Sequence, residues 1–410
     1  MRKNLYFALA LSCLCTLSQA QQISPAQQLI TNEDSLNAGA AKSKTVISGY
    51  GSASYQRDFN AGVSTMNLDR AVLFVGHRFT DKLSFFSELE VEDAKVEGGS
   101  DGGEVAMEQA YIKFDLSPKQ YIVAGLFIPR IGILNENHLP VNFNGVERPL
   151  VETVIIPATW RELGVAFYGS ANSIPLNYSV GIMNGLNSEG FEHGSGIREG
   201  RAEGRTATAN NLAISAALQY SWKDFKFQIS GYAGGTVGLS KRAADSLGLN
   251  SGAFGTPVYI GEGDLQYSKN GFSAKALFAY ISYPEADKVN AAYAKNLATG
   301  MYGTYGELAY DLLYKKQKKA QLISFVRYEA FDLNSSIPAA PFGIYDGTEK
   351  QSHLLLGLGY LPIPNVVIKA DIRLVHTGPQ NPALIINPPP NALPYQENNQ
   401  VLNLGIGYSF

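Results

Sequence analysis

The chain has 410 residues, including 41 glycines, 23 tyrosines and 20 phenylalanines, and carries a formal net charge of −3 at a mean hydropathy near zero. The absence of a basic excess excludes the usual signature of a nucleic-acid-binding protein. No segment has 18 consecutive apolar residues, so a bundle of membrane-spanning helices is also excluded. If this chain crosses a bilayer, it must do so as a closed β-barrel, because only a barrel or a helix satisfies its backbone groups in lipid.

The first twenty residues have the pattern of an export signal. Arg2 and Lys3 form a positive start, residues 5–17 are mostly apolar, and residues 18–20 (SQA) provide small residues for cleavage. The apolar run is too short for a spanning helix. We therefore expect a signal peptide over 1–20 that is removed on export.

Removal of this signal changes what the exported chain contains. Cys13 and Cys15 both lie inside it, so the mature chain has no thiol, disulfide or cysteine-bound metal. The mature chain retains 31 basic and 36 acidic residues, a net charge of −5. Residues 21–45 are polar and lack a strand pattern, which indicates a flexible periplasmic lead-in, and residues 46–410 are expected to form the barrel.

Alternation with a period of two predicts strands in the rest of the chain. In residues 401–410, Leu402, Leu404 and Ile406 lie on one face, while the other face is small and polar. Turn residues between such segments divide the chain into sixteen predicted strands: 46–56, 67–79, 83–93, 105–116, 120–127, 160–169, 175–184, 211–221, 225–234, 262–268, 271–280, 302–314, 320–331, 350–361, 364–375 and 400–410.

The connections between these strands fall into two classes. Even-to-odd connections are tight, as in 80–82 and 269–270, whereas odd-to-even connections run from about ten residues to more than thirty, as in 128–159. Short turns at one end, long loops at the other and an even strand count are typical of outer-membrane barrels of Gram-negative bacteria. We expect an all-β transmembrane antiparallel barrel of about sixteen strands with short periplasmic turns and long extracellular loops.

The residues indicate no catalytic or metal site. The five histidines lie in different predicted elements without metal-ligand spacing, and no nucleophile elbow, phosphate loop or calcium loop is present. We therefore expect no enzyme activity and no cofactor.

Charge recurs on the predicted inner face of the barrel. The predicted pore-lining residues are Glu88, Glu90, Glu92, Lys113, Asp115, Lys275, Glu307, Asp311, Arg327, Glu329, Lys369, Asp371 and Arg373. Buried unpaired charge is costly, so a lumen of this kind is expected to be wet. Two readings remain: a water-filled channel, favoured by the bore of a sixteen-stranded barrel, or a plugged barrel whose charges pair across strands.

The longest connection, 128–159, is the candidate constriction, because a loop of this length has a function or is disordered. The predicted constriction residues are Arg130, Glu136, His138, Glu147, Arg148 and Arg161. A surface flap at the rim is the alternative. Loop 186–210, rich in glycine and charge, is expected to be a solvated outer loop.

Several segments in this order resemble one known group, the phosphate-selective porin family of porins O and P. They are 108–112 (EQAYI), 124–129 (AGLFIP), 145–149 (GVERP), 155–160 (IIPATW), 180–185 (VGIMNG), 303–310 and 327–329 (RYE). The resemblance implies a sixteen-stranded barrel, often a homotrimer, with loops folded into the pore. The terminal Phe410 resembles the signal that such barrels present to the barrel-assembly machinery.

The resemblance extends to the fold but not to the solute. Phosphate selectivity in the family is attributed to an arginine ladder and a lysine cluster, and the few inward basic residues here are interleaved with acidic ones. We therefore predict a porin in contact with outer-membrane lipid that passes small polar solutes or ions, phosphate among the candidates. The alternative is a non-conducting barrel that binds a ligand or partner through its outer loops.

Overall fold

The computed structural model describes residues 44–92, 104–316, 319–384 and 395–410. The predicted signal peptide and almost all of the predicted lead-in lie outside these residues. The strands are β1 (Thr45–Asp58), β2 (Val63–Arg78), β3 (Leu83–Glu92), β4 (Glu104–Ser117), β5 (Gln120–Phe127), β6 (Glu162–Ser170), β7 (Leu176–Asn184), β8 (Leu212–Trp222), β9 (Phe225–Gly235), β10 (Pro257–Lys269), β11 (Phe272–Ser282), β12 (Gly300–Asp311), β13 (Gln321–Ser336), β14 (Lys350–Ile363), β15 (Val366–Thr377) and β16 (Asn398–Ser409).

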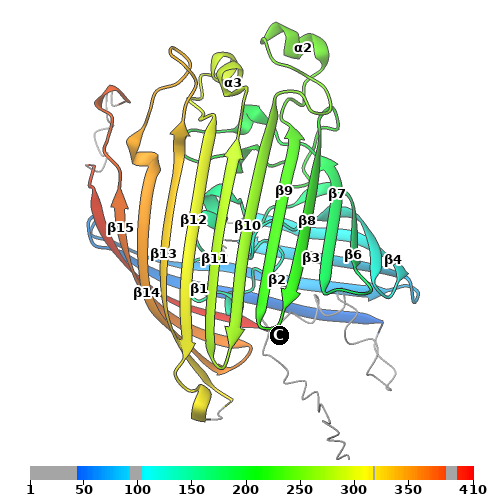
Figure 1. Ribbon diagram of the computed structural model, residues 1–410, viewed down its shortest axis with the longest axis vertical. Helices are drawn as coiled ribbons and strands as arrows, with labels where there is room; N and C mark the ends of the chain where they lie inside the picture. Colours follow the sequence, from blue (N-terminus) through cyan, green and yellow to red (C-terminus); the bar gives the residue numbers. More distant parts are fainter. Residues whose placement is uncertain (1–43, 93–103, 317–318, 385–394) are drawn as a thin grey trace, which may run out of the picture.

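These sixteen strands form one closed antiparallel barrel in sequence order, which confirms the predicted fold class. Strand β1 closes the ring by pairing with β16, with Tyr50 opposite Ser409. At this seam Phe410 donates its backbone N–H to Gly49 O at 2.8 Å. Figure 1 shows β8 to β15 on the near wall and the blue strands β1 and β2 crossing behind them at a steep angle.

Within the described residues, short helical segments occur only in the connections between strands. They are η1 (Pro140–Asn142), η2 (Val151–Ile155), η3 (Ser188–Gly190), η4 (Arg198–Gly200), α2 (Lys241–Ser246), α3 (Ala286–Tyr293), η5 (Tyr314–Lys316), η6 (Gly347–Glu349) and η7 (Pro382–Leu384). None of the described helices is long and apolar enough to cross a bilayer.

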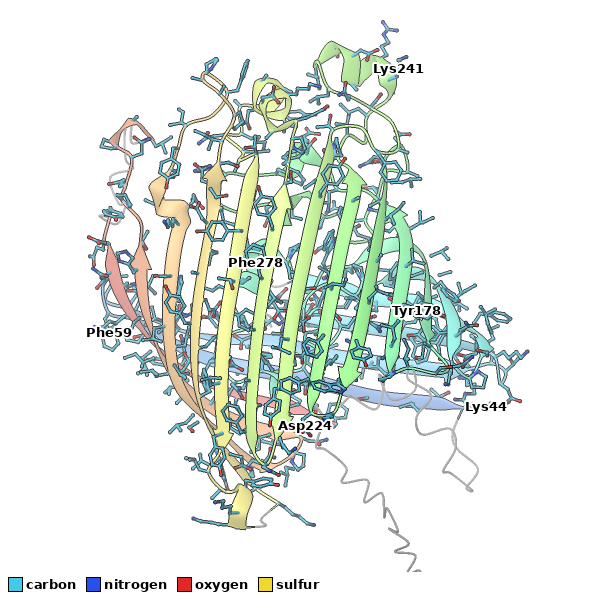
Figure 2. All side chains as sticks on the ribbon, viewed as in Figure 1. Lys44, Phe59, Tyr178, Asp224, Lys241 and Phe278 are labelled. Carbon is cyan, nitrogen blue, oxygen red and sulfur yellow. The ribbon has the colours of Figure 1, made fainter. Side chains whose placement is uncertain are left out.

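The two classes of connection lie at opposite ends of the barrel. Figure 2 marks Asp224, in a tight turn, at one end and Lys241, in a long loop, at the other. One predicted long connection is wrong: the link between β1 and β2 is only residues 59–62. The two strands pair up to Asp58 and Val63, and Asp58 accepts the Ala61 N–H at 2.8 Å to close the turn.

Side chains alternate between the two faces of the wall as a pleated strand requires. In β4, Ile112 and Phe114 are 38% and 43% exposed, whereas Lys113 between them is 1% exposed. Phe278, at mid-height on the outer face (Figure 2), is 52% exposed. Apolar side chains thus cover the outside of the wall, the surface that a transmembrane barrel presents to lipid.

Candidate functional site

The connection between β5 and β6, residues 128–161, lies inside the barrel and is called the inner loop below. Its Val146 N–H donates to Asp371 of β15 at 2.7 Å, and its Gly132 carbonyl accepts from Gln228 of β9 at 2.9 Å. Strands β9 and β15 are six places apart in the ring. A single segment that reaches inward-facing side chains of both must cross the lumen, so the predicted inward folding is the arrangement in the structure.

Glycines in the last strand make room for this loop. A Cβ on Gly405 would lie 2.8 Å from Val146, and one on Gly407 would lie 2.5 Å from Pro140. Real Cβ atoms essentially never approach other atoms this closely, so a larger residue at either position would displace the loop. The small, polar face predicted for residues 401–410 is therefore the wall against which the inner loop packs.

Arg327 is the centre of the charged wall. Its guanidinium is fully buried and lies 2.9 Å from Glu307 and 3.2 Å from Glu329. Asn144 of the inner loop donates to the same Glu307 at 2.8 Å. A buried guanidinium needs such paired carboxylates, because removal of charge from water costs several kcal/mol per ion.

Other wall charges bind the backbone of the inner loop. Lys369 donates to the carbonyls of Phe143 and Gly145 at 2.7 and 2.8 Å. Lys275 donates to Asn142 O at 3.3 Å. Since a carbonyl is neutral, these ammonium groups are solvated by the loop rather than neutralised by it.

Arg373 of the wall and Glu147 of the inner loop, both predicted site residues, form an ion pair that is partly exposed to water. Glu147 remains 42% exposed while Arg373 is 9% exposed, and Gln56 of β1 donates weakly to the same carboxylate. This pair lies between the loop and the wall at the edge of the buried region.

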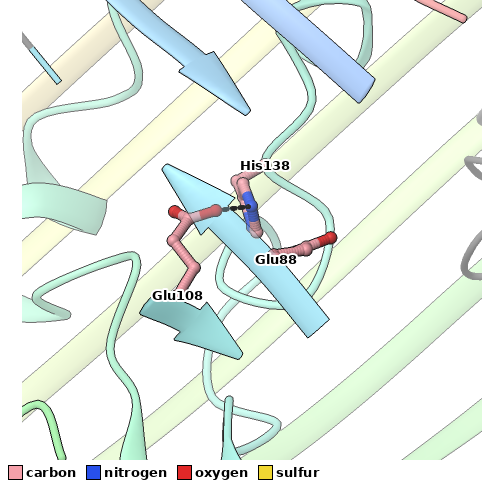
Figure 3. A group of neighbouring side chains, drawn as sticks. All are labelled: Glu88, Glu108 and His138. Carbon is pink, nitrogen blue, oxygen red and sulfur yellow. Dashed lines mark ion pairs between the residues drawn. The ribbon is translucent and has the colours of Figure 1, made fainter. Parts of the chain in front are cut away.

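On the opposite wall, Glu108, Glu88 and the loop residue His138 come together (Figure 3). His138 Nε2 lies 3.6 Å from Glu108 and 2.8 Å from the Tyr50 hydroxyl, which itself donates to Glu108 at 2.8 Å. Arg70 lies 3.2 Å from both Glu90 and Glu92. Arg70 therefore links the predicted residues Glu90 and Glu92 to Glu108 and His138, and Glu88 lies beside this network, where it accepts a hydrogen bond from Gln109.

Arg148, a predicted constriction residue, has surroundings that disfavour its positive charge. Burial, reinforced by the nearby Arg70, lowers the pKa of Arg148 to about 10. Within the described residues its Nη2 atom has no hydrogen-bond partner. Its environment therefore favours an acceptor or an anion that the wall itself does not supply.

The remaining predicted residues lie away from the loop–wall contact. Lys113 pairs with Asp115 at 2.8 Å on β4. Asp311 accepts the N–H groups of Leu313 and Leu322, so its carboxylate closes the turn between β12 and β13. Asp311 is buried on the inner face of β12 with its Oδ1 engaged by this turn, and its role as a pore-lining charge stays a prediction.

Three predicted loop residues form ion pairs outside the wall network. Arg130 pairs with Glu136 at 2.6 Å within the inner loop. Arg161 pairs with Glu203 at 3.2 Å, and Glu203 belongs to the connection between β7 and β8, residues 185–211. Arg201 of that second loop donates to Pro157 O at 2.9 Å. The interpretation of residues 186–210 as a solvated outer loop is wrong, because this loop packs on the inner loop.

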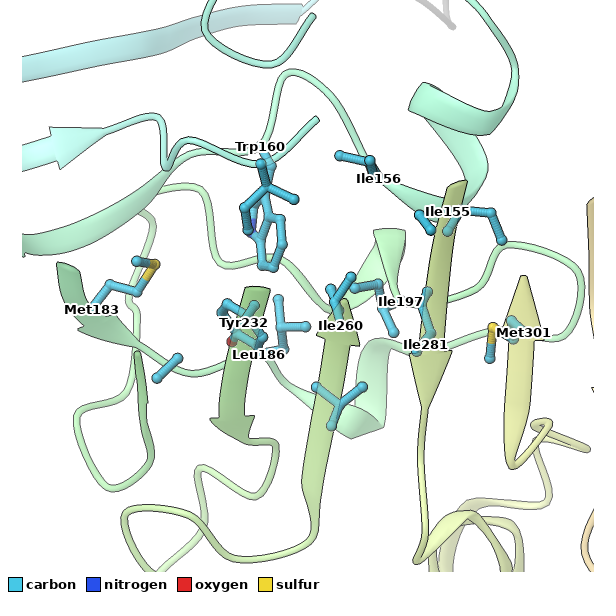
Figure 4. Packing of buried hydrophobic residues seen from close by; sticks show 14 of the residues in the cluster. Ile155, Ile156, Trp160, Met183, Leu186, Ile197, Tyr232, Ile260, Ile281 and Met301 are labelled. Atoms are coloured by element: carbon cyan, nitrogen blue, oxygen red, sulfur yellow. The ribbon is translucent and has the colours of Figure 1, made fainter. Parts of the chain in front are cut away.

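Apolar packing joins the two loops to the other side of the wall (Figure 4). Trp160 is fully buried, and its ring centroid lies 4.7 Å from that of Tyr232 on β9. The cluster also contains Ile155, Ile156, Met183, Leu186, Ile197, Ile260, Ile281 and Met301. Burial of this many large side chains removes a large apolar area from water, so this part of the loop is packed like a protein core.

Glu152 anchors the same part of the inner loop. Its carboxylate accepts the N–H groups of Ile133 and Leu134 at 2.8 and 2.6 Å and the Tyr305 hydroxyl at 2.6 Å. Burial raises the pKa of Glu152 to about 7, and these hydrogen bonds oppose the shift. The group therefore titrates near neutral pH.

The predicted wetness of the wall charges is also wrong for most of them. Ten of the thirteen predicted pore-lining residues are buried, in contacts with each other, with the inner loop or with neighbouring groups of the wall and its turns; Glu92, Asp115 and Lys275 are only partly exposed. A charged residue on the inner face therefore predicts a contact with another protein group as readily as it predicts a contact with water.

Glu108 is the most informative residue that the predicted set lacks. Counting back in steps of two from Lys113 places Gln109 on the inner face, but the pairing of β3 with β4 jumps from Glu88↔Gln109 to Leu89↔Met107. This bulge leaves Glu108 unpaired in the ladder and turns it inward, fully buried. Periodicity alone has no signal for such a bulge.

Comparisons with known proteins agree with the barrel. Solved structures that match include an anion-selective porin from Comamonas acidovorans (11% identity, 90% of this chain and 100% of that chain, TM-score 0.54). The trimer form of Vibrio cholerae OmpT matches with 10% identity over 89% of this chain and 99% of that one (TM-score 0.52). Salmonella typhi OmpF in complex with daunomycin has 11% identity over 89% and 97% (TM-score 0.52). These likenesses concern the fold alone.

Sequence comparison gives a nearer relative. No family model matches the chain, so the resemblance to the porin O and P family stays a prediction. An uncharacterized protein of Aquifex aeolicus (strain VF5) is 32% identical over 337 residues, which are 79% of this chain and 74% of that protein. The chain belongs to the same family as this Aquifex aeolicus protein.

Proposed function

We propose that this protein is an outer-membrane porin through which small polar solutes and ions diffuse passively, with the inner loop as its constriction. The observation that carries the proposal is the inner loop itself, which crosses a sixteen-stranded barrel and is bonded to walls as far apart as β9 and β15. A barrel of this size leaves an aqueous bore unless something fills it. The loop narrows that bore without a covalent link.

The location follows from the same barrel. An outer face of apolar side chains would lie in lipid, and residues 1–20 would direct export to the outer membrane of a Gram-negative cell. Phe410, 58% exposed beside the seam of the barrel, would be available to the assembly machinery. We further propose a homotrimer, the form named for the matched Vibrio cholerae structure.

The balance of charge argues for weak selectivity. Of the thirteen predicted wall residues, eight are acidic and five are basic, and ten are buried, several of them in ion pairs that offset their charge. Arg148 favours anions, because its buried Nη2 lacks an acceptor and, unlike Arg327 or Arg373, it forms no ion pair with a carboxylate within the described residues. We therefore expect only a small preference between ions, and phosphate remains a candidate solute through Arg148.

A plugged barrel is the second candidate. The observation in its favour is the burial and pairing of the wall charges, which removes the need for water in the lumen. Such a barrel would act through its long loops, where α2 and α3 project from one end (Figure 1). Under either candidate we propose no catalytic step.

Conductance in a planar lipid bilayer decides between the two. The purified protein is added to a salt gradient, and single-channel current and reversal potential are recorded before and after addition of phosphate. Ohmic steps with a reversal potential near zero are the expected result. A folded protein, shown by heat-modifiable gel mobility, that gives no steps would overturn the porin and favour the plugged barrel.

Phosphate is tested in the same recording. Block by phosphate in the wild type that is lost in Arg148→Met would assign anion passage to Arg148. Block that is unchanged in the variant would move the anion site elsewhere.

A further inference from the structure

Three long loops meet at His193, at the end of the barrel opposite the tight turns. His193 belongs to the loop 185–211. Its Nδ1 atom lies 2.9 Å from the carbonyl of Asn296, in the loop between β11 and β12, and its Nε2 atom lies 3.0 Å from Asp346, in the loop between β13 and β14. Glu349, in η6 of that last loop, lies 3.9 Å from Nε2. One imidazole therefore connects three loops.

The hydrogen bonds leave one place for a cation. A carbonyl oxygen only accepts, so Nδ1 must carry the proton that it donates to Asn296. In the neutral imidazole, Nε2 then points a lone pair at Asp346 and Glu349, whose carboxylates also only accept. The imidazole nitrogen and one oxygen of each carboxylate all lie within 4.8 Å of one another. Water, a proton on Nε2 or a metal ion can satisfy these three atoms, and only a metal ion can bind all three at once.

The charge around this group favours a cation with more than one charge. The carboxylates of Asp346 and Glu349 lie close together beside His193, and the Asp332 carboxylate lies near enough to Glu349 to act on it. Within the described residues no lysine or arginine forms an ion pair with Asp346 or Glu349. A single imidazolium would leave this group of three carboxylates with a negative charge.

The ligands are also held in place before any ion binds. Asp346 Oδ1 accepts from the Thr348 N–H and hydroxyl at 3.0 and 2.7 Å, which leaves Oδ2 turned toward His193. Gly194 has a φ of +80°, and a Cβ there would lie 2.8 Å from Glu349, so the glycine permits the carboxylate to approach. The His193, Asp346 and Glu349 side chains are 29%, 15% and 17% exposed, so an ion can reach them from solvent.

We propose that His193, Asp346 and Glu349 bind a divalent transition-metal ion of the zinc class and thereby fasten three outer loops together. Imidazole nitrogen and carboxylate oxygen are both ligands of Zn²⁺, whereas Ca²⁺ and Mg²⁺ prefer oxygen alone. A histidine ligand whose other nitrogen donates to a backbone carbonyl is the usual arrangement around such metals. Three protein ligands leave a further position for water.

The second histidine–carboxylate group of the structure differs in the features that matter. At His138, Nε2 faces the Tyr50 hydroxyl, and Gln109 donates to Glu88 at 2.7 Å. Arg70 lies 3.9 Å from Glu108, so a cation is already present. A metal ion there would have to displace hydrogen bonds and face a guanidinium.

Zinc binding to the full-length protein in detergent tests the proposal. After treatment with a chelator, the protein is titrated with Zn²⁺ by calorimetry at neutral pH. We expect one saturable site per chain, with an affinity that falls by roughly tenfold or more in His193→Ala. Ca²⁺ is expected to bind more weakly than Zn²⁺.

Two further variants keep the result interpretable. His376→Ala removes another exposed histidine near a single carboxylate, Glu397, and should bind Zn²⁺ like the wild type. Glu349→Gln keeps the shape of the loop and should weaken binding. Zn²⁺ should also slow hydrogen exchange at residues 192–197 and 344–349 in the wild type but not in His193→Ala.

The proposal would be overturned by no saturable Zn²⁺ binding, by equal binding in wild type and His193→Ala, or by equal losses in His193→Ala and His376→Ala. Because conductance is not part of this test, its outcome does not depend on whether the barrel is a porin.

Discussion

Two segments of the inner loop are held in the barrel by different forces. Residues 138–148, the polar segment, contact charged side chains of the wall, such as Lys369 and Asp371. Residues 150–160, the apolar segment, pack Val151, Ile155 and Trp160 into a core where all three are fully buried. The polar segment is thus fixed by contacts that depend on charge, and the apolar segment by burial.

The two segments should therefore differ in which conditions can displace them from the wall. Apolar burial is non-directional and does not depend on charge, so the apolar segment should respond to pH only through Glu152, its one titratable side chain. The contacts of the polar segment can be exchanged for water or solute at small net cost, since protein and water compete for the same hydrogen bonds. We expect solute passage, if it occurs, along the polar segment.

The largest expected effect comes from Trp160→Ala in the apolar segment. Loss of a fully buried tryptophan leaves a cavity and removes the indole donor to Glu162, and should lower the free energy of unfolding by about 4 to 5 kcal/mol. Thermal unfolding followed by heat-modifiable gel mobility measures the loss. The chain has one other tryptophan, Trp222, which is 50% exposed on the outer face. If Trp222→Ala destabilised the protein as strongly, the apolar segment would not be the main anchor.

Arg327→Met tests the wall beneath the polar segment. The variant leaves Glu307 and Glu329 buried without their cation, and should cost about 3 to 4 kcal/mol, again measured by thermal unfolding. The same change at the exposed Arg205 is the control and should be nearly silent. A loss at Arg327 no larger than at Arg205 would mean that the carboxylates find other partners or take up protons without cost.

Sequence periodicity predicted the barrel well because the wall follows a strict two-residue repeat. The β13 prediction, 320–331, lies within one residue of its start, although the strand continues to Ser336. The same repeat put Lys113 inside and Phe114 outside, as the structure has them. Local alternation and turn chemistry are sufficient for these features, since each depends on neighbouring residues only.

The lumen was less accessible to prediction, since its contacts join residues far apart in the chain. The partners Val146 and Asp371 are 225 residues apart, and His193 and Asp346 are 153 apart. Spacing of histidines along the chain therefore missed the group around His193. Glu108 was missed for another reason, because a bulge reverses its face. The inward charges could be recognised from alternation, but whether they meet water or each other depends on the path of the loop.

A pH titration sharpens the comparison through Glu152, the titratable anchor of the apolar segment. With the inner loop packed in the barrel, the pKa of Glu152 is about 7, above its ordinary value of 4.5. The packed loop therefore holds the proton more tightly than the unfolded chain does. The stabilisation is complete below about pH 4.5 and is lost as the pH rises through 7, a change of about 3 kcal/mol.

Hydrogen exchange at the amides of Ile133 and Leu134 measures this change, because both donate to Glu152. We expect faster opening, corrected for intrinsic exchange, as the pH rises from 5 to about 8. Glu152→Gln keeps an acceptor for these amides and cannot ionise, so the pH dependence should disappear. A pH dependence that persists in Glu152→Gln would assign it to another group, with Asp264 and Lys275 the nearest charges.

Glu147→Gln should have the smallest effect on stability. Because Glu147 is 42% exposed, water and salt already screen its pairing with Arg373, and the loss should be below about 1 kcal/mol. Its effect on ion passage should be easier to detect, since removal of an exposed carboxylate beside Arg373 leaves a net positive charge on the polar segment. The reversal potential in a salt gradient should shift in the direction of anion selectivity, more at low ionic strength than at high.

Glu136→Gln, which changes a loop carboxylate paired with Arg130, is the matched comparison. Equal shifts in both variants would show that the lumen responds to total charge, whereas a shift in Glu147→Gln alone would place the path of the ion along the polar segment.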